Sequence, residues 1–143
     1  MQEKNQLELK EEKRKMTKLT KNFNLSEFES KDGSKMPDDV LENVKVHAYN
    51  LQTIRDFCNA TVTINSAYRS PSHNKNIGGA SKSQHLTGNA TDITVKGFSP
   101  DQVADIIEGL IRIDAIEEGG VGRYNTFTHY DRRGYKARWD NRS

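Results

Sequence analysis

The sequence predicts an α+β fold, a small and mostly antiparallel sheet with two long helices packed against it. Two stretches with helical periodicity, residues 38–58 and 99–111, are separated along the chain by short stretches with strand periodicity. The chain has 143 residues, which is enough for one compact core but not for two. Elements that share one core must form layers, so we expect both helices against a single sheet.

Both predicted helices have an apolar face. In residues 38–58 apolar side chains recur every three or four positions, and His47 is expected at the edge of this packed face. The second helix begins with a capping box, with Ser99 as the N-cap, Pro100 at the first helical position and Gln102 at the third. Its apolar stripe consists of Val103, Ile106, Ile107, Leu110 and Ile111.

Three segments have the alternation of strands. Residues 61–65 and 90–95 are rich in β-branched side chains, and residues 126–133 alternate again. Successive side chains of a strand point to opposite faces, so the last segment places four residues on one face: Phe127, His129, Asp131 and Arg133. The glycine-rich residues 119–122, which precede this strand, are expected to form a turn.

Two further segments connect these elements. Near the start, Ser26 is expected to cap a short turn, which would clip onto the domain through Phe23, Leu25 and Phe28. Residues 70–89 are expected to form a long polar loop that contains His85. A loop of this length in so small a domain is commonly functional, so we expect part of the functional site there.

The first eighteen residues are too polar to be buried. They contain six Lys or Arg and four Asp or Glu, and besides the initiator Met1 their apolar side chains are Leu7, Leu9 and Met16. A docking arm is one interpretation, but a solvated, frayed helix or a disordered tail fits the composition better. We therefore expect residues 1–20 to form a charged tail and residues 21–143 to form the folded domain.

Composition argues against several functional classes. The net charge of +2 is too small for a nucleic-acid-binding protein, which usually has a concentrated basic face. No stretch reaches membrane-spanning length, and the polar N-terminus has no signal-peptide core, so we expect a protein made in the cytoplasm without a signal peptide. The single cysteine, Cys58, excludes a closed thiolate zinc site and is expected to be a buried, inert thiol.

The residues with the clearest chemical pattern are His85, Asp92 and His129. Two imidazoles and one carboxylate are typical ligands of catalytic zinc, which keeps a fourth position for water, whereas structural zinc has four protein ligands. Gly88 permits a sharp bend and a close approach of the backbone to the metal. Water at the open position would have a pKa of about 7, which suits hydrolysis at neutral pH. The sequence therefore predicts a single Zn²⁺ site with hydrolytic chemistry.

Residues 83–92, with the pattern Ser-x-His-x-x-Gly-x-Ala-x-Asp, and the later strand histidine resemble the zinc D-alanyl-D-alanine carboxypeptidase and L-alanyl-D-glutamate endopeptidase family. The resemblance covers most of the chain. It includes residues 66–71 (Ser-Ala-Tyr-Arg-Ser-Pro), residues 120–124 (Gly-Val-Gly-Arg-Tyr) and residues 127–131 (Phe-Thr-His-Tyr-Asp). Several motifs in the same order are far more specific than an isolated His-x-x-Gly.

The resemblance implies a peptidase that cuts peptide bonds in bacterial cell-wall peptides, with the two histidines and the aspartate as zinc ligands. It also implies that Arg69 holds a substrate carboxylate or polarises the scissile carbonyl, tasks that suit the fixed fork of donors in a guanidinium. Ser83 resembles a serine that contacts substrate. His73 is close enough in sequence to touch substrate, although a hydrogen bond that fixes the loop is the simpler interpretation, and we do not expect it to bind the metal.

The proton acceptor is where the chain departs from better known relatives. Many of them have a Glu three residues before the last ligand and others have a His two before it, but these positions are Thr126 and Phe127 here. Asp131, two residues after His129 on the same strand face, lies within reach of a metal-bound water or of the outer side of a ligand. It is therefore the candidate catalytic base. Orienting His129 and pairing with a nearby arginine are its alternative roles, and Asp92 could exchange roles with it.

These features favour a zinc metallopeptidase that acts on peptidoglycan stem peptides, as a D-Ala-D-Ala carboxypeptidase or an L,D-endopeptidase. Without a secretion signal, such an enzyme would act at the cell wall after release, as a phage or prophage endolysin, or on a virion. The alternative is a noncatalytic, zinc-containing peptidoglycan-binding module of a phage or wall-associated assembly, which the missing glutamate supports. We expect a monomer that binds the stem peptide, and neither nucleic acid nor a membrane as partner.

Overall fold

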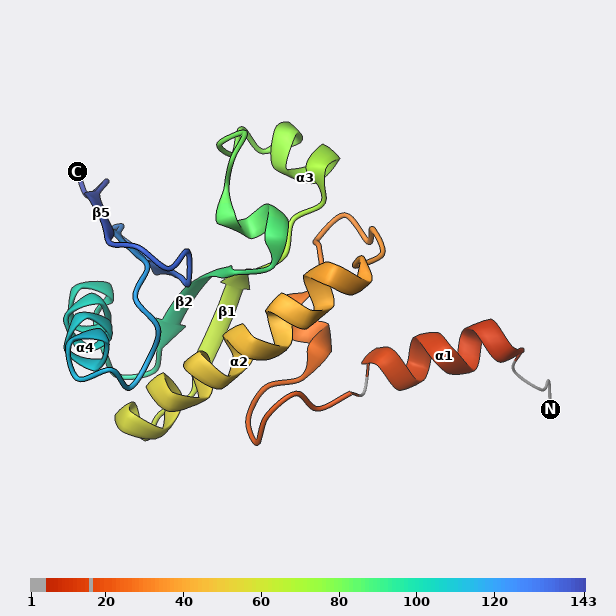
Figure 1. Cartoon of the computed structure of the whole chain (residues 1–143), viewed down its shortest axis with the longest axis horizontal. Helices are drawn as coiled ribbons and strands as arrows, with labels where there is room; N and C mark the ends of the chain where they lie inside the picture. The colour runs from red at the N-terminus through yellow and green to blue at the C-terminus, as the bar shows by residue number, and fades with distance from the viewer. Residues whose placement is uncertain (1–4, 16) are drawn as a thin grey trace.

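The computed structural model describes residues 5–15 and 17–143. Helix α1 (Gln6–Lys15) projects away from the body of the molecule, and the side chains of residues 6–10 are exposed (Figure 1). This helix lies in the segment expected to form a charged tail, of which residues 1–4 and 16 are outside the described part. The chain joins the domain just after α1, where the N–H of Leu25 donates to the carbonyl of Thr17 at 2.8 Å.

A five-stranded sheet forms the centre of the domain, in the order β1-β2-β4-β3-β5. The strands are β1 (Val62–Ser66), β2 (Ala90–Val95), β3 (Gly120–Arg123), β4 (Thr128–Asp131) and β5 (Ala137–Asp140). All neighbours are antiparallel except β3 and β5, which run parallel. The sheet is thus mostly antiparallel, as predicted.

Two long helices share the core with this sheet, which confirms the predicted fold class. Helix α2 (Asp38–Cys58) has the predicted bounds, and it ends at Asn59, whose φ of 48° is left-handed. Helix α4 (Pro100–Arg112) has the predicted capping box, in which Ser99 Oγ accepts from Gln102 N and Gln102 Oε1 accepts from Ser99 N. In Figure 1 α2 crosses in front of β1 and α4 lies beside β2, and the buried apolar side chains of both helices belong to one hydrophobic cluster.

The two connecting segments contain more regular structure than predicted. Residues 70–89 are not one irregular loop, because they include α3 (Pro71–Asn76) and the 3-10 helix η2 (Gln84–Thr87). Each begins at a serine whose Oγ accepts a backbone N–H, Ser70 from His73 and Ser83 from His85. Short helices of this kind have no apolar periodicity, so the pattern of hydrophobic residues did not reveal them.

The predicted turn at residues 119–122 is also wrong, since most of it is strand β3. Glycine is depleted in strands, and this is why the segment resembled a turn. The structure needs glycine there because the neighbouring strand lies very close. A Cβ on Gly120 would lie 2.3 Å from Oδ2 of Asp131, so no larger residue fits without a shift.

Three single-residue expectations need adjustment. The short 3-10 helix η1 (Leu25–Phe28) begins at Asn24, whose N–H donates to the Glu27 carboxylate, so Ser26 is not the cap. His47 is completely buried instead of lying at the edge of the α2 face. Cys58 is half-buried, and burial raises the pKa of its thiol, in keeping with an inert role.

The apolar clip is confirmed, since Phe23, Leu25 and Phe28 are all buried in the core. Phe23 and Phe28 also contact each other edge to face, with 6.2 Å between ring centroids. None of the helices in the described part of the chain is long and apolar enough to cross a membrane.

Candidate metal centre

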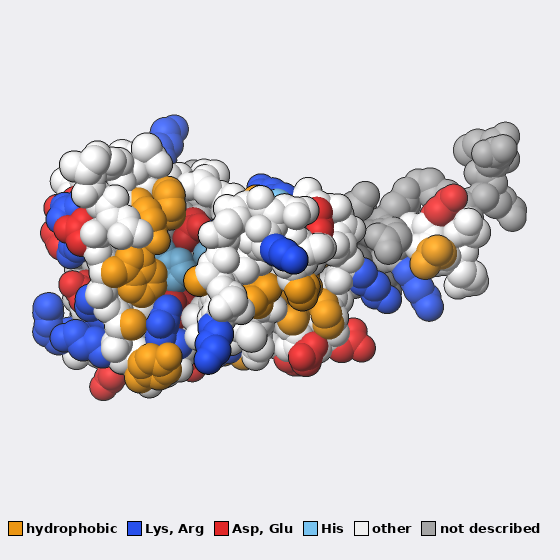
Figure 2. Space-filling view, turned by 90° about the horizontal axis from the view of Figure 1, so that it is seen from above, with side chains coloured by type: hydrophobic (Ala, Val, Ile, Leu, Met, Phe, Trp, Pro, Cys, Tyr) orange, Lys and Arg blue, Asp and Glu red, His pale blue; other side chains and the backbone are white. Residues whose placement is uncertain are grey.

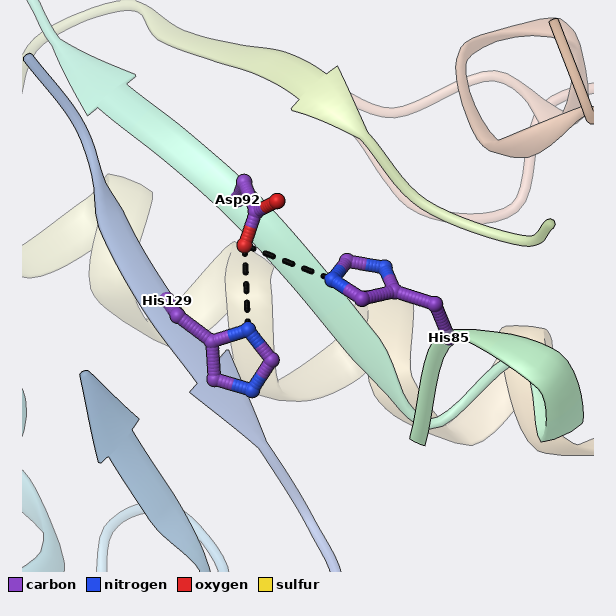
Figure 3. Close-up of side chains that lie close together, drawn as sticks. All are labelled: His85, Asp92 and His129. Carbon is purple, nitrogen blue, oxygen red and sulfur yellow. Dashed lines mark hydrogen bonds and ion pairs between the residues drawn. The ribbon is translucent and has the colours of Figure 1, made fainter. Parts of the chain in front are cut away.

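The side chains of His85, Asp92 and His129 converge at one point of the structure (Figure 3). Each offers one ligand atom, and these atoms all lie within 4.8 Å of one another. The three side chains are buried, with 3%, 7% and 7% of their respective residues exposed. In the described residues this is the one group of three or more His, Cys, Asp or Glu that could hold a metal ion.

Strand pairing places Asp92 and His129 side by side. They are directly paired in the antiparallel register of β2 and β4, so both side chains point to the same face of the sheet. His129 Nδ1 lies 3.0 Å from Asp92 Oδ1. Strand pairing thus brings together two residues that are far apart in the sequence.

His85 reaches the same point from η2. Its Nδ1 donates to the backbone carbonyl of Ala67 at 2.7 Å, so Nε2 is the nitrogen that faces the centre, 3.4 Å from Asp92 Oδ1. The turn after η2 is closed by Gly88 at φ 79°. A Cβ there would lie 2.8 Å from Val44 of α2, so this glycine permits close packing against the helix instead of the expected approach of the backbone to the metal.

Asp131 lies on the outer side of His129, away from Asp92. Its Oδ2 is 2.7 Å from His129 Nε2, and the residue is completely buried. Its carboxylate also accepts hydrogen bonds from the backbone N–H of Gly120 and from Arg133. Both oxygens therefore have several donors. This placement corresponds to the orienting role considered from the sequence, and the carboxylate does not line the pocket at the metal centre.

Asp92 has an outer partner as well. Arg69 NH2 lies 3.4 Å from its Oδ2, the oxygen that faces away from the histidines. The other donors of Arg69 contact Ser66 Oγ through Nε and Asn74 Oδ1 through NH1. These contacts fix Arg69 beside the ligands. Arg69 in turn fixes the orientation of the Asp92 carboxylate.

The electrostatics of the centre follow from these contacts. Burial alone would raise the pKa of Asp92, but hydrogen bonds from His129 and His85 outweigh it and hold this pKa well below its usual value. Burial would lower the pKa of His129, whereas the carboxylates of Asp131 and Asp92 raise it. Burial likewise acts to raise the pKa of Asp131, but Arg133 and His129 lower it. Both carboxylates are thus ionised at neutral pH.

The donor set fits a zinc ion. With Nδ1 of His85 donating to a carbonyl, the lone pair of Nε2 faces a carboxylate oxygen, and this arrangement is favourable only with a cation or a proton between them. Two imidazole nitrogens and one carboxylate oxygen make three ligands, the number found in catalytic zinc sites. Each ligand also has the outer hydrogen bond that is typical of such sites: His85 donates to Ala67, His129 donates to Asp131, and Asp92 accepts from Arg69.

The centre lies in an open pocket of about 610 Å³. Figure 2 shows histidine surface in this hollow, with hydrophobic side chains along one side. Arg69 and Ser83 line the pocket as the sequence suggested, whereas His73 is not among the lining residues. His73 instead lies within α3, where its backbone N–H donates to Oγ of the N-cap residue Ser70.

Three residues important to the pocket were assigned no role at the site from the sequence. Asn74 is buried and joins Arg69 to the glycine loop, since its Oδ1 accepts from Arg69 and its Nδ2 donates to the carbonyl of Ala80. Arg133 and Trp139 line the opposite side. The alternation of residues 126–133 had placed Arg133 on the face of His129, and this pattern was the available signal.

A model of the peptidase M15 family matches residues 15–131, which is most of the chain. The chain belongs to the peptidase M15 family. This is a family of zinc-dependent metallopeptidases, so the resemblance inferred from the motifs is confirmed, and the His-Asp-His group lies within the matched region. No curated protein is similar enough to the chain to count as a match.

Proposed function

We propose that the protein is a zinc-dependent peptidase that hydrolyses peptide bonds of peptidoglycan stem peptides, as a D-Ala-D-Ala carboxypeptidase or as an L,D-endopeptidase. The observation that carries this proposal is the convergence of His85, Asp92 and His129 in one open pocket. Membership of the peptidase M15 family supports the same chemistry.

His85, Asp92 and His129 would hold a zinc ion, which would supply an activated water at neutral pH and polarisation of the scissile carbonyl. The protein holds the donor atoms in place for this. The Ala67 carbonyl selects the tautomer of His85, and Asp131 selects that of His129 by accepting from Nε2, so that Nδ1 is left for the metal. We therefore assign Asp131 as a positioning residue rather than as the base.

Arg69 is the residue we assign to the scissile carbonyl. Its side chain is 15% exposed and lines the pocket next to Asp92. A guanidinium has five N–H donors, and the contacts with Ser66, Asn74 and Asp92 use three of them. The remaining donors are held beside the ligands, where they can stabilise negative charge on the carbonyl oxygen. Ser83 Oγ, on the same side, is assigned to substrate contact.

One observation favours a second candidate, a noncatalytic zinc-containing module that binds peptidoglycan in a phage or wall-associated assembly. Asp92 is the one carboxylate among the described residues that line the pocket, and it is engaged by both histidines. Efficient hydrolysis usually includes a positioned proton acceptor within hydrogen-bond reach. A binding module needs none.

The two candidates are separated by turnover. Purified, zinc-loaded protein is incubated with synthetic stem peptides, and new amino groups are measured with and without a chelator. Chelator-sensitive release of amine that is lost in His129→Ala and kept in His73→Ala supports the peptidase. If zinc-loaded protein binds the peptides and releases no amine from any of them, the binding module is the correct function.

The substrate determines the place of action that we propose. Stem peptides belong to the bacterial cell wall, so the protein would act there after release from the cytoplasm, as a phage or prophage lysis enzyme, or on a virion. We also propose that it acts as a monomer. Fractionation of the producing cells tests the location, and gel filtration of the full chain tests the oligomeric state.

A further inference from the structure

The pocket at the metal centre has two chemically different walls. On one side are the small residues 78–80 with Lys82 and Ser83, in the segment between α3 and η2. On the other side are Tyr124, which follows β3, Phe127, which precedes β4, and Trp139 of β5. In Figure 1 the α3 segment and β5 lie on either side of β2, which carries Asp92. A substrate in this pocket therefore lies between a small-residue wall and an aromatic one.

The aromatic wall is well ordered by its own contacts. Tyr124 and Phe127 stack with ring centroids 4.3 Å apart, and the indole N–H of Trp139 donates to the hydroxyl of Tyr124 at 2.9 Å. The Trp139 ring lies 4.9 Å from that of His129. The wall thus begins at a metal ligand and offers apolar ring surface to a substrate.

Arg133 is the charged residue of this wall. Its Nε and NH2 donate to the two oxygens of Asp131 at 2.8 and 2.7 Å. Its guanidinium carbon lies 5.3 Å from the centroid of the Trp139 ring and 5.7 Å from that of Tyr135. A guanidinium held along one edge and against two rings is ordered before any ligand arrives, and NH1 takes no part in the bonds to Asp131.

The two arginines of the pocket occupy opposite ends of one chain of contacts. Arg69 contacts Asp92, Asp92 contacts His129, His129 contacts Asp131, and Asp131 contacts Arg133. Arg69 is therefore next to the oxygen of a metal ligand, whereas Arg133 is separated from the metal centre by Asp131 and His129. We therefore assign the two cations to different groups of the substrate.

The charge of the pocket favours an anionic ligand. Among the described residues, three cationic side chains line it, Arg69, Lys82 and Arg133, against the single carboxylate of Asp92. A bound divalent ion increases this excess. Positive potential in a hollow with apolar walls is focused, so it selects and attracts negatively charged groups.

We propose that Arg133 is a specificity-determining residue that binds a carboxylate of the substrate peptide on the aromatic side of the metal centre, an inference that rests on the proposed function. Arg69 then serves the scissile carbonyl, and the apolar part of the residue that carries the carboxylate lies against Trp139. The bond to the carboxylate is charge-assisted, and the fixed plane of the guanidinium gives it direction.

Probe binding tests this inference without relying on turnover. Trp139 is the single tryptophan of the chain and belongs to the same wall, so its fluorescence reports binding in a stopped-flow mixer before cleavage. The probes are two matched pairs: acetyl-D-Ala-D-Ala with its carboxyl free or amidated, and acetyl-L-Ala-D-Glu with its carboxyls free or amidated. The zinc-loaded full chain is expected to bind the free acid of at least one pair about tenfold more tightly.

Variants assign this preference to a residue. Arg133→Gln is expected to reduce it to less than about twofold, and Arg133→Lys to an intermediate value, because lysine keeps the charge without the fork. Lys136→Gln is the matched control, since it removes the same charge from an exposed position in the same segment that does not line this pocket. Zinc content is measured for each variant, and Arg133→Lys decides the result if Arg133→Gln does not retain zinc.

The outcomes are distinct from those of the proposed function. A wild-type protein without preference for either acid, an unchanged preference in both Arg133 variants, or an equal loss in Lys136→Gln overturns the inference, even if the protein cleaves stem peptides. A preference that depends on Arg133 in a protein that releases no amine supports the inference, while the peptidase proposal fails.

Discussion

The two faces of the central sheet each bury a histidine, in surroundings of opposite polarity. Adjacent residues of a strand point to opposite faces, so Asp92 and His129 lie on one face while their neighbours Thr91 and Tyr130 lie on the other. On the first face His129 contacts two carboxylates in the metal centre. On the second face His47 of α2 contacts the Thr91 hydroxyl at 2.9 Å and stacks on the Tyr130 ring at 5.4 Å.

The two rings are both buried, yet their pKa values move in opposite directions. Burial and the charge of Arg132 lower the pKa of His47 to about 3, although Asp131 acts in the opposite sense. For His129, burial acts in the same direction, but Asp131 and Asp92 raise the pKa above its ordinary value. Burial alone does not decide the chemistry of a histidine. The charge of its hydrogen-bond partners does, and this separates a site residue from a core residue.

Of the changes that test this comparison, the largest effect is expected from His129→Ala, which should cause loss of the metal. His129→Ala removes one of three ligands, so zinc affinity should fall well beyond the 10–100-fold that loss of an outer partner causes, and stem-peptide cleavage should cease. Zinc bound per chain is measured after gel filtration, with circular dichroism to confirm folding. His73→Ala, outside the pocket, should keep its zinc. Full retention of zinc in His129→Ala would refute the assignment of this ligand.

Removing His47, the buried histidine on the opposite face of the sheet, should lower stability and leave the metal site intact. His47→Ala deletes a fully buried ring and leaves the Thr91 hydroxyl without its partner, so the free energy of unfolding should fall by about 2–4 kcal/mol. Urea unfolding of the zinc-loaded protein measures this. Tyr49→Ala on the exposed side of the same helix should change it by less than about 0.5 kcal/mol. Equal effects of the two variants would contradict the burial argument.

A substitution of Asp131 distinguishes its role in orienting His129 from the role of a catalytic base. Asp131→Asn should weaken zinc binding about 10–100-fold, because an amide holds the His129 ring less well than a carboxylate does. Competition with a chelator of known affinity gives the value, and Asp140→Asn, a change at an exposed carboxylate on β5, is the control. An unchanged zinc affinity with greatly reduced kcat would instead favour the role of base.

The smallest expected effect is a pH dependence that belongs to His47. Its pKa is about 3 in the folded protein, against about 6.5 in an unfolded chain. Between these values the unfolded state binds a proton that the folded state does not, so His47 lowers stability as pH falls below 6.5, by up to about 1.4 kcal/mol per pH unit. The difference between wild type and His47→Phe, at equal zinc content from pH 7 to pH 5, should follow this slope. A constant difference would count against a neutral buried His47.

Local patterns predicted the elements whose signals are local. The bounds of α2 agree with the periodicity of residues 38–58, and the box at Ser99 located the start of α4, because helical spacing and caps act over a few residues. The same patterns missed β3, where contact with Asp131 of β4 requires Gly120 and contact with Trp139 of β5 requires Gly122. They also placed His47 on a helix face without giving its depth, since depth depends on what packs against that face.

The sequence by itself determined the donor set of His85, Asp92 and His129, the α+β scaffold and the family. Only the tertiary structure decided which nitrogen of each histidine faces the candidate metal centre, since that depends on the Ala67 carbonyl and on Asp131. It also decided that Asp131 is buried behind a ligand and that Arg133 lies in the pocket wall. These outcomes depend on strand register and on hydrogen bonds between residues distant in the chain, and spacing along a sequence does not specify either.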